Sequence, residues 1–180
     1  MSVKYEILKC PEDLQVHEKN FYQVFYKDDK EKKWDLSDYE VREDRLVSQI
    51  PYDQFMIFGV KYNNLLVSDL SVFPGDRVLK KSNFQYHIND NICEAYKYYI
   101  LKDHPVLIGL GAGIMDMIQG FHQYLYRELY NRGMRYLYAS CYEDLLGFYT
   151  RFGEFEVVDK QTANGHKAFL MIKEIPAPSI

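Results

Sequence analysis

The chain has 180 residues, apolar and charged fractions close to the average for folded proteins, and a formal net charge of −4. A chain of this length usually forms one domain, and this composition excludes global disorder. The net negative charge disfavours a nucleic-acid partner, because neutralising phosphates needs a concentrated basic face. We therefore expect residues 1–180 to form a single globular domain that binds no nucleic acid.

The cysteines and histidines show no pattern of metal ligands. Cys10, Cys93 and Cys141 lack C-x-x-C spacing, and the five histidines share no ligand spacing. Three reduced thiols are typical of the cytoplasm, so we expect a cytoplasmic protein without a bound metal. The most apolar run, Val106 to Met115, has about half of the roughly 20 residues that a membrane span needs. We expect that run to be a loop, and we expect neither a membrane anchor nor a signal peptide.

The N-terminal third predicts a strand followed by a helix. Val3 to Leu8 is a candidate strand. Pro11 and the acidic residues behind it predict a helix start, and a roughly helical apolar stripe carries the helix to about Tyr26. Asp35 to Ser48 is polar and mixed, so a second short helix or a loop fits it equally well.

The middle of the chain predicts a β-hairpin. Phe55 to Tyr62 and Leu65 to Phe73 are strand-like runs joined by Asn63-Asn64. Asparagine tolerates positive φ, so this pair suits a two-residue turn. The polar connection from Pro74 to Asn91 follows, and a compact domain keeps a connection of that length mainly when it has a function.

The next segment predicts a parallel βαβ unit. Ile92 to Leu101 alternates and is rich in tyrosine, which indicates a strand. A glycine-rich segment leads into the clearest helix, Ile114 to Asn131, whose apolar residues recur at three- and four-residue spacing. Arg135 to Cys141 reads as the second strand. The crossover rule makes this unit right-handed.

The C-terminal segment predicts a helix and two closing strands. Ser140 and Glu143 stand at capping-box spacing, so we expect a helix from Ser140 to Gly153. Phe155 to Gln161 and Lys167 to Ile175 then read as strands about the turn Asn164-Gly165.

This order of elements resembles that of the GNAT acyltransferases. Asn131 to Ala139 resembles the family's helix-to-strand joint, and Leu145 to Gly153 resembles its lYeklGF segment, with Glu154 inserted before Phe155. With the glycine-rich segment, the likeness covers about Ile92 to Ile175. The resemblance implies a three-layer α/β/α fold around a central mixed, mostly antiparallel sheet. It also implies an acyltransferase that moves an acetyl or longer acyl group from CoA, or from an acyl carrier protein, to a small-molecule or protein amine.

The glycine-rich segment is the candidate cofactor site. Glycines let the backbone approach a phosphate, and the helix start directs free N–H groups and a positive dipole end towards it. In the family this element grips the CoA pyrophosphate, which here implies Gly109, Gly111, Ala112, Gly113 and Ile114. The family motif has Gln or Arg where this chain has Ile108, which points to modified cofactor binding, a carrier-protein donor or lost catalysis. The alternative is that the glycines only make a tight turn.

The resemblance also implies roles for the neighbouring strand and helix. The main-chain groups of four residues would hold the pantetheine arm as an added strand: Tyr98, Tyr99, Ile100 and Leu101. Tyr149 would protonate the leaving thiolate, because a phenol is protonated at neutral pH. Without the resemblance, Tyr149 reads as a core residue on the same stripe as Leu145 and Phe152.

Amine acylation needs a base, and two carboxylates are candidates. Glu94 begins the strand before the glycine-rich segment, and Asp69 lies inside an apolar strand, where a carboxylate is costly to bury unless it is paired. Each is otherwise a solvated strand residue. Cys141 with His122 or His166 would be a nucleophilic pair, but a small buried thiol is the commoner outcome.

Two further readings remain open. Aromatic residues such as Phe21, Phe25 and Trp34, ahead of Tyr52-Asp53 and the hairpin that ends in Phe73-Pro74, resemble the N-terminal layout of autoinducer-synthase-like members, which use long acyl chains. The Ile108 departure motivates the alternative of a GNAT-fold protein without catalysis, acting as an acyl-CoA sensor or a protein-interaction module. A homodimer formed through the final strands is also left open.

Overall fold

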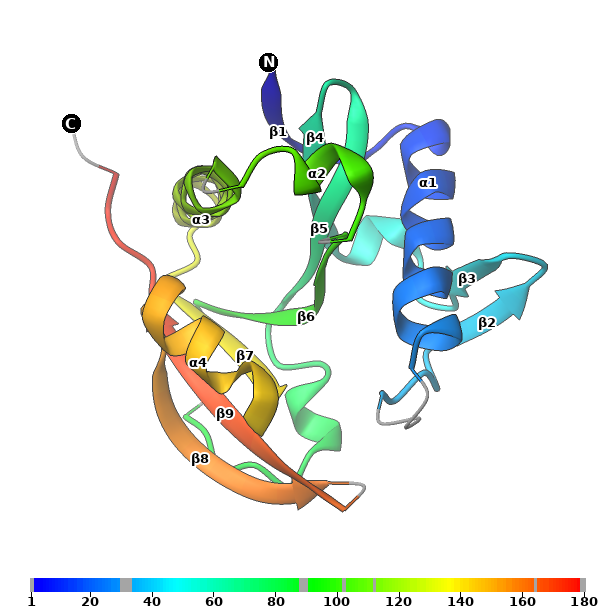
Figure 1. Ribbon diagram of the computed structural model, residues 1–180. Helices are drawn as coiled ribbons and strands as arrows, with labels where there is room; N and C mark the ends of the chain where they lie inside the picture. The colour runs from blue at the N-terminus through cyan, green and yellow to red at the C-terminus, as the bar shows by residue number, and fades with distance from the viewer. Residues whose placement is uncertain are drawn as a thin grey trace.

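The centre of the fold is a seven-stranded sheet, with strands from both ends and the middle of the sequence. The structure is a computed structural model that describes residues 2–29, 34–87, 91–101, 103–111, 113–163 and 165–178. The strands lie in the order β1-β4-β5-β6-β7-β9-β8 (Figure 1). Neighbouring strands pair antiparallel, except that β6 and β7 are parallel. Their bounds are β1 (Val3–Ile7), β4 (Met56–Tyr62), β5 (Leu65–Pro74), β6 (Ile92–Ile100), β7 (Tyr136–Tyr142), β8 (Glu156–Ala163) and β9 (His166–Glu174).

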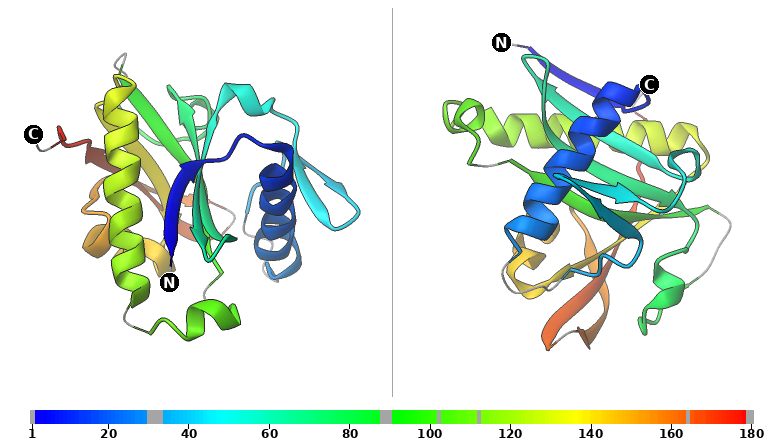
Figure 2. Two further views of the ribbon diagram at one scale, coloured as in Figure 1. Left: turned by 90° about the horizontal axis from the view of Figure 1, so that it is seen from above. Right: turned by 90° about the vertical axis from the view of Figure 1, so that its right-hand side faces the viewer.

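Helices cover both faces of this sheet. α3 (Gly113–Asn131) lies against one face and α1 (Pro11–Phe21) against the other (Figure 2). α4 (Glu143–Phe152) joins α3 in burying the largest apolar cluster against the sheet, around Phe121 and Leu125. The three-layer α/β/α architecture and the mixed, mostly antiparallel sheet are therefore confirmed. No helix in the described part of the chain has both the length and the apolar character needed to cross a membrane.

The N-terminal region departs from the sequence expectation at two places. The predicted helix changes after Phe21 into a π-helical turn, η1 (Tyr22–Lys27), in which the Asp28 amide donates to the Gln23 carbonyl at 2.9 Å. Only the start of Asp35 to Ser48 is a loop: from Tyr39 the segment forms the hairpin of β2 (Tyr39–Arg42) and β3 (Arg45–Ser48). Each strand has only four residues, too few for the alternation of polar and apolar positions to be read.

The central hairpin is confirmed. Asn63 and Asn64 have φ angles of 49° and 65°, which turn β4 back into β5. The short 3₁₀ turns η2 (Tyr52–Gln54) and η3 (Leu79–Lys81) lie on either side of this hairpin in the sequence.

The βαβ unit is confirmed, with two local corrections. Part of the expected loop from Val106 is helical, because α2 (Pro105–Ile108) forms one short turn before α3. The capping-box prediction at Ser140 is wrong: Ser140 lies inside β7, and α4 begins at Glu143 without a side-chain cap. β7 pairs with β9 as far as Tyr142, so the sheet hydrogen bonds extend β7 beyond the predicted helix start. Asn164, in the predicted final turn, lies outside the described residues.

Candidate functional site

The two parallel strands at the centre of the sheet separate along their length. β6 and β7 pair from Ile92 opposite Tyr136 to Ala95 opposite Ala139, and the described residues show no pairing beyond that point. β6 nevertheless continues to Ile100 alongside β5, and β7 continues to Tyr142 alongside β9. The strands therefore diverge after Ala95, and from there the main chain of β6 has a strand partner on one side only.

Tyr149 of α4 lies on the α3 side of this divergence. Its ring is half-buried and stands perpendicular to the ring of Phe155 at 5.7 Å between centroids. Burial raises the pKa of the Tyr149 phenol, and the nearby Tyr98 phenol and Cys141 thiol add to the rise. Tyr98 belongs to β6 and Cys141 to β7, so the phenol lies within electrostatic reach of both diverging strands. It is protonated at any physiological pH.

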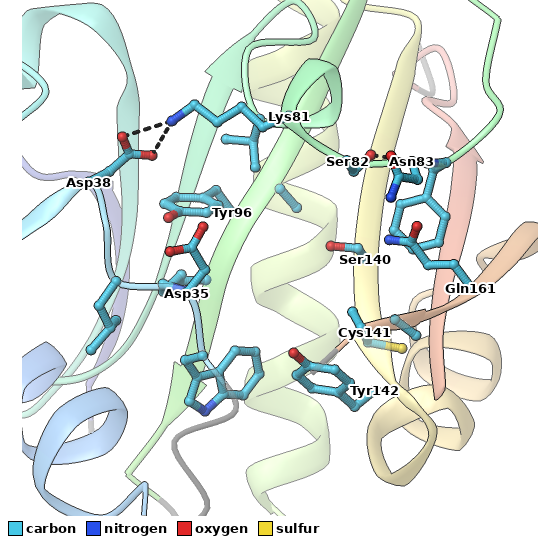
Figure 3. A pocket seen from close by; sticks show the side chains of 18 of the residues that line it. Asp35, Asp38, Lys81, Ser82, Asn83, Tyr96, Ser140, Cys141, Tyr142 and Gln161 are labelled. Carbon is cyan, nitrogen blue, oxygen red and sulfur yellow. Dashed lines mark hydrogen bonds and ion pairs between the residues drawn. The ribbon is translucent and has the colours of Figure 1, made fainter. Parts of the chain in front are cut away.

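A cavity of about 620 Å³ opens on the same divergence. Four parts of the chain form its walls: the loop before β2, the connection between β5 and β6, the two diverging strands, and the β8–β9 hairpin. Figure 3 shows these walls from close by, with α3 lying behind the strands. Its lining residues are Trp34, Asp35, Leu36, Asp38, Val78, Lys81, Ser82, Asn83, Phe84, Ala95, Tyr96, Lys97, Ser140, Cys141, Tyr142, Gln161, Thr162, Ala163 and Ala168.

Lys97 is a cavity residue that the sequence analysis missed. Its backbone has a φ of 62°, and its ammonium lies over three rings, at 5.5, 5.2 and 4.8 Å from the centroids of Phe25, Trp34 and Tyr96. Burial lowers the pKa of Lys97 to about 8, against the opposing effect of the Asp35 carboxylate. The available signal was a lysine among the tyrosines Tyr96, Tyr98 and Tyr99 of that strand.

Comparison with known proteins identifies solved structures that have a similar fold. No family model matches the sequence, and no curated protein matches it. Among solved structures, the acyl-homoserine lactone synthase BjaI, described with SAM and isopentyl-CoA, matches with a TM-score of 0.72 at 12% identity over 97% of this chain and 84% of that chain. The AHL synthase LasI matches with a TM-score of 0.71 at 12% identity over 98% of this chain and 91% of that chain.

A third solved structure carries the family name. It is assigned to the GNAT family of acetyltransferases, comes from Desulfovibrio desulfuricans, and matches with a TM-score of 0.55 at 12% identity over 97% of this chain and the whole of that chain. This chain has the GNAT fold. At these identities the likeness establishes the fold, and the chemistry has to be argued from the residues.

Within the GNAT fold, the glycine-rich segment forms a tight turn into α3. The Gly113 amide donates to the Leu110 carbonyl at 2.9 Å, and the Ile114 amide donates to the Gly111 carbonyl at 3.3 Å. Gly111 has a φ of 53°, and a Cβ built on it would meet no atom within 4 Å, so this corner is open to solvent. The segment therefore has the tight turn that was the alternative interpretation, and its binding of a pyrophosphate stays a prediction.

Two neighbours of that turn bear on the same prediction. Ile108, which replaces the family's Gln or Arg, is 66% exposed, so the corner presents an apolar side chain to solvent. Ala112 lies outside the described residues, and so does Lys102.

The four residues expected at the cofactor, Tyr98 to Ile100 of β6 and Leu101 just after it, do not share one face of the sheet. The ring of Tyr98 faces α3 and stacks on Phe121 at 5.8 Å between centroids. Tyr99 faces α1, where its hydroxyl donates to Asp69 at 2.7 Å. The Leu101 amide donates to the Val67 carbonyl at 2.9 Å, so this end of the segment is held by β5. Pantetheine binding by Tyr98, Tyr99, Ile100 and Leu101 therefore concerns their main chain.

Glu94 is held by the backbone of the β5–β6 connection. Only 3% of it is exposed, and its carboxylate accepts hydrogen bonds from the amides of Val78 and Leu79, the latter at 2.8 Å. Burial raises the pKa of Glu94 to about 7. The side chain is not among those that line the cavity of about 620 Å³. The geometry gives Glu94 the task of positioning η3, and its role as a base stays a prediction.

Asp69, the second candidate base, is fully buried in a polar network. Its Oδ2 atom lies 2.9 Å from His17 Nδ1 and accepts the hydrogen bond from Tyr99. Asn20 donates to the Tyr99 hydroxyl at 2.9 Å. The paired carboxylate thus ties α1 to β5 and β6, which explains how an acidic residue is accommodated inside the sheet.

The suggested cysteine–histidine pair is not assembled. Cys141 contacts the sulfur of Met171 at 3.8 Å, and burial raises the pKa of its thiol to about 12. The ring of His166 packs on Tyr142, and that of His122 lies on α3 between Phe121 and Tyr126. In the described ranges, no group of three or more His, Cys, Asp or Glu side chains could hold a metal ion.

Proposed function

We propose that this chain is an acyltransferase that moves an acetyl or longer acyl group from CoA to an amine acceptor. The observation that carries the proposal is the divergence of β6 from β7, with Tyr149 within reach of both strands and a cavity opening on the same point. A thioester held there would have a proton donor and a space for the acceptor beside its carbonyl. Proximity of this kind supplies much of the rate of a bimolecular reaction.

The free side of β6 supports the binding of the donor. Beyond Ala95 the strand pairs with β5 alone, so its other main-chain groups can take an extended pantetheine arm as an added strand. The diphosphate would then lie at the start of α3, where Gly111 leaves the corner open. The described part of that corner offers no Gln or Arg at the Ile108 position, so backbone and helix dipole would have to supply most of the attraction.

The chemistry would follow from these positions. The acceptor amine, seated in the cavity, attacks the thioester carbonyl directly, and a main-chain amide at the irregular part of β6 polarises the oxygen. Tyr149 protonates the thiolate as it leaves, and the proton that the amine nitrogen releases restores the Tyr149 phenol. Burial keeps the phenol protonated before the reaction, so the proton is in place, but it also makes the phenol a weaker acid towards the thiolate.

The choice of acyl chain has some support from the aromatic cavity walls. Trp34 lines the cavity and packs perpendicular to Phe25, and the AHL synthases match this chain with higher TM-scores than the acetyltransferase does. BjaI is described with isopentyl-CoA. We therefore include branched and medium-length acyl-CoA thioesters with acetyl-CoA as candidate donors, and a carrier-protein thioester as the alternative.

Replacement of Tyr149 tests the proposal. Acyl-CoA binding is measured by calorimetry, and thiol release is followed with a thiol reagent over a panel of amines. Tyr149→Phe should lower turnover by roughly 10²- to 10⁴-fold while acyl-CoA affinity is unchanged. Tyr126→Phe, which removes a hydroxyl bound to the Gly153 carbonyl, is the matched control. Equal turnover for wild type and Tyr149→Phe would remove Tyr149 from the mechanism.

A non-catalytic acyl-CoA sensor or interaction module is the second candidate. The observation in its favour is that the amides of Gly113 and Ile114 are already hydrogen-bonded within the turn, next to the apolar Ile108. A sensor would bind acyl-CoA in the calorimeter and release no thiol with any amine. Restoring the family residue with Ile108→Arg should then tighten acyl-CoA binding without producing turnover.

A further inference from the structure

The cavity of about 620 Å³ contains two lysines in different states. Lys81 donates to both carboxylate oxygens of Asp38 at 2.9 Å, as Figure 3 shows. Lys97 makes no ion pair with any described residue, and its ammonium is surrounded by aromatic rings instead. Buried charges in proteins are normally paired. Lys97 is therefore an amine available to whatever enters the cavity.

The backbone of β6 is irregular at this lysine. Leu70 pairs with Tyr98 and Val72 with Ala95, so two residues of β6, Tyr96 and Lys97, stand opposite the single residue between them on β5. This β-bulge brings both Tyr96 and Lys97 into the cavity lining. Bulges re-aim side chains next to active sites, and a non-glycine residue at φ 62° persists where the surrounding structure enforces it.

The bulge lies at the point where the sheet opens. Ala95 is the last residue of β6 that pairs with β7, and Lys97 follows two positions later. Tyr98, the next residue, is the β6 side chain whose phenol acts on the pKa of Tyr149. The amine of Lys97 and the phenol of Tyr149 are thus presented around the same stretch of strand, which is where the donor thioester is proposed to lie.

The protonation state of Lys97 allows it to react. Burial brings the pKa of its ammonium to about 8, so roughly a tenth of the protein carries the neutral amine at pH 7. Cys141 is the other nucleophile in the cavity wall, and its raised pKa keeps it a thiol. The titratable and charged groups that line the cavity around Lys97, or act on it from the preceding loop, are Asp29, Asp35, Asp38, Lys81, Tyr96, Cys141 and Tyr142.

We propose that the ε-amine of Lys97 is a self-acylation site, which takes the acyl group from a thioester held at the divergence of β6 and β7. The inference rests on the proposed function, because it needs that thioester in place. The neutral nitrogen attacks the carbonyl carbon and forms the amide bond, and the carbon–sulfur bond breaks. The thiolate takes up one proton, the nitrogen releases one, and the products are acyl-lysine and a free thiol.

Acylation of Lys97 would change the cavity. The amide is stable, so the acyl group stays, the positive charge disappears, and the group occupies space between the three rings. A chain modified in this way has less room and a more negative lining for an incoming acceptor. Self-acylation would therefore act as a brake when thioester is abundant and acceptor is scarce.

The test is a time course of lysine acetylation in the intact chain, read by mass spectrometry of its peptides. The protein is incubated from pH 6 to pH 9 with acetyl-CoA, and separately with S-acetyl-N-acetylcysteamine, a small thioester without a nucleotide. Lys97 should be acetylated at least about tenfold faster than Lys81 and the exposed Lys160, with a rate that rises through about pH 8. Lys97→Arg keeps the charge and should lose the modified peptide.

The two thioesters separate this proposal from the proposed function. Faster labelling of Lys97 by acetyl-CoA than by the small thioester supports both. Selective labelling by the small thioester alone supports the reactive amine and counts against CoA as the donor. Binding of acetyl-CoA, seen as a raised melting temperature, with no preference for Lys97 over Lys160 overturns self-acylation and leaves the acyl-CoA site standing. Uniform slow labelling without binding overturns both.

Discussion

Replacing Tyr99 with phenylalanine should reveal how strongly the buried network holds α1 to the sheet. The hydroxyl of Tyr99 donates to Asp69 Oδ2 at 2.7 Å and accepts from Asn20 at 2.9 Å. The other carboxylate oxygen of Asp69 has no hydrogen-bond partner among the described residues. Loss of the hydroxyl therefore leaves the carboxyl group with His17 alone, and no solvent reaches the site to replace the bond.

The cost follows from the kind of bond that is lost. A hydrogen bond to a carboxylate contributes about 1.5–3 kcal/mol to stability, because the group it leaves behind is expensive to bury. A domain of this size loses about 2–4 °C of melting temperature for each kcal/mol. Tyr99→Phe should therefore melt roughly 3–12 °C below the wild type. The ring itself stays, so packing against Phe21 is retained.

Urea denaturation followed by circular dichroism measures this loss, and Tyr126→Phe is the matched control. The Tyr126 hydroxyl is also buried, and it donates to the neutral carbonyl of Gly153 at 3.0 Å. Its removal should cost only about 0.5–1.5 kcal/mol. If Tyr99→Phe costs no more than Tyr126→Phe, the Asp69 network does not anchor α1, and the explanation of the buried carboxylate is wrong.

Two further predictions concern buried ionisable groups. Burial raises the pKa of Glu94 from 4.5 to about 7, so the native state holds more protons than the unfolded state between these values. The free energy of unfolding should therefore fall as pH rises from about 4.5 to 7, and Glu94→Gln should flatten that fall; equal slopes in urea titrations would contradict it. Cys10 is exposed, although the neighbouring Asp13 side chain raises the pKa of its thiol, whereas Cys93 and Cys141 are buried and burial raises the pKa of both. A disulfide reagent should therefore modify one thiol quickly in the native protein and all three after unfolding, and more than one fast thiol would mean that the core opens.

Much of the fold could be predicted from the sequence because its signals are local. Asn63-Asn64 supply the left-handed conformations that a tight hairpin needs, and the spacing of apolar residues in Ile114 to Asn131 produces one buried helix face. The strand–helix–strand order then fixes a parallel pair at the centre of the sheet. Each of these features is determined by residues that are close to it in the sequence.

The errors occur where contacts distant in the sequence decide the structure. Ser140 has the spacing of a helix cap, but pairing with β9 keeps it in a strand. The β2–β3 hairpin turns at Glu43, with a φ of 57°, where no glycine or asparagine marks the turn. The short strands are held by the burial of Tyr39 and Leu46 under α1 and η1, which only the folded chain brings together.

The residues of the candidate site also differ in whether nearby sequence or distant contacts determine their positions. The tyrosine of α4 is proposed from the sequence because its segment resembles the family pattern, and its role stays a prediction. Lys97 is not, because its place depends on a bulge that exists only relative to the neighbouring strand. The task of Glu94 was also hidden, since it is bonded to amides of a connection 15 and 16 residues away in the chain.

Paired strands of the main sheet line the back of the cavity. Much of its rim is formed by connecting segments that are not strands of that sheet. Residues 34–36, Asp38 and residues 81–84 belong to that rim, and the hydrogen bonds of the seven strands do not pass through them. Exchange of the exposed rim residues Asp35, Lys81 and Asn83 would therefore alter which molecule is admitted while the scaffold keeps its stability, whereas Phe84 is buried in a core cluster and is part of that scaffold. In this chain, substitutions at the exposed rim can therefore change which substrate binds largely without affecting the stability of the sheet.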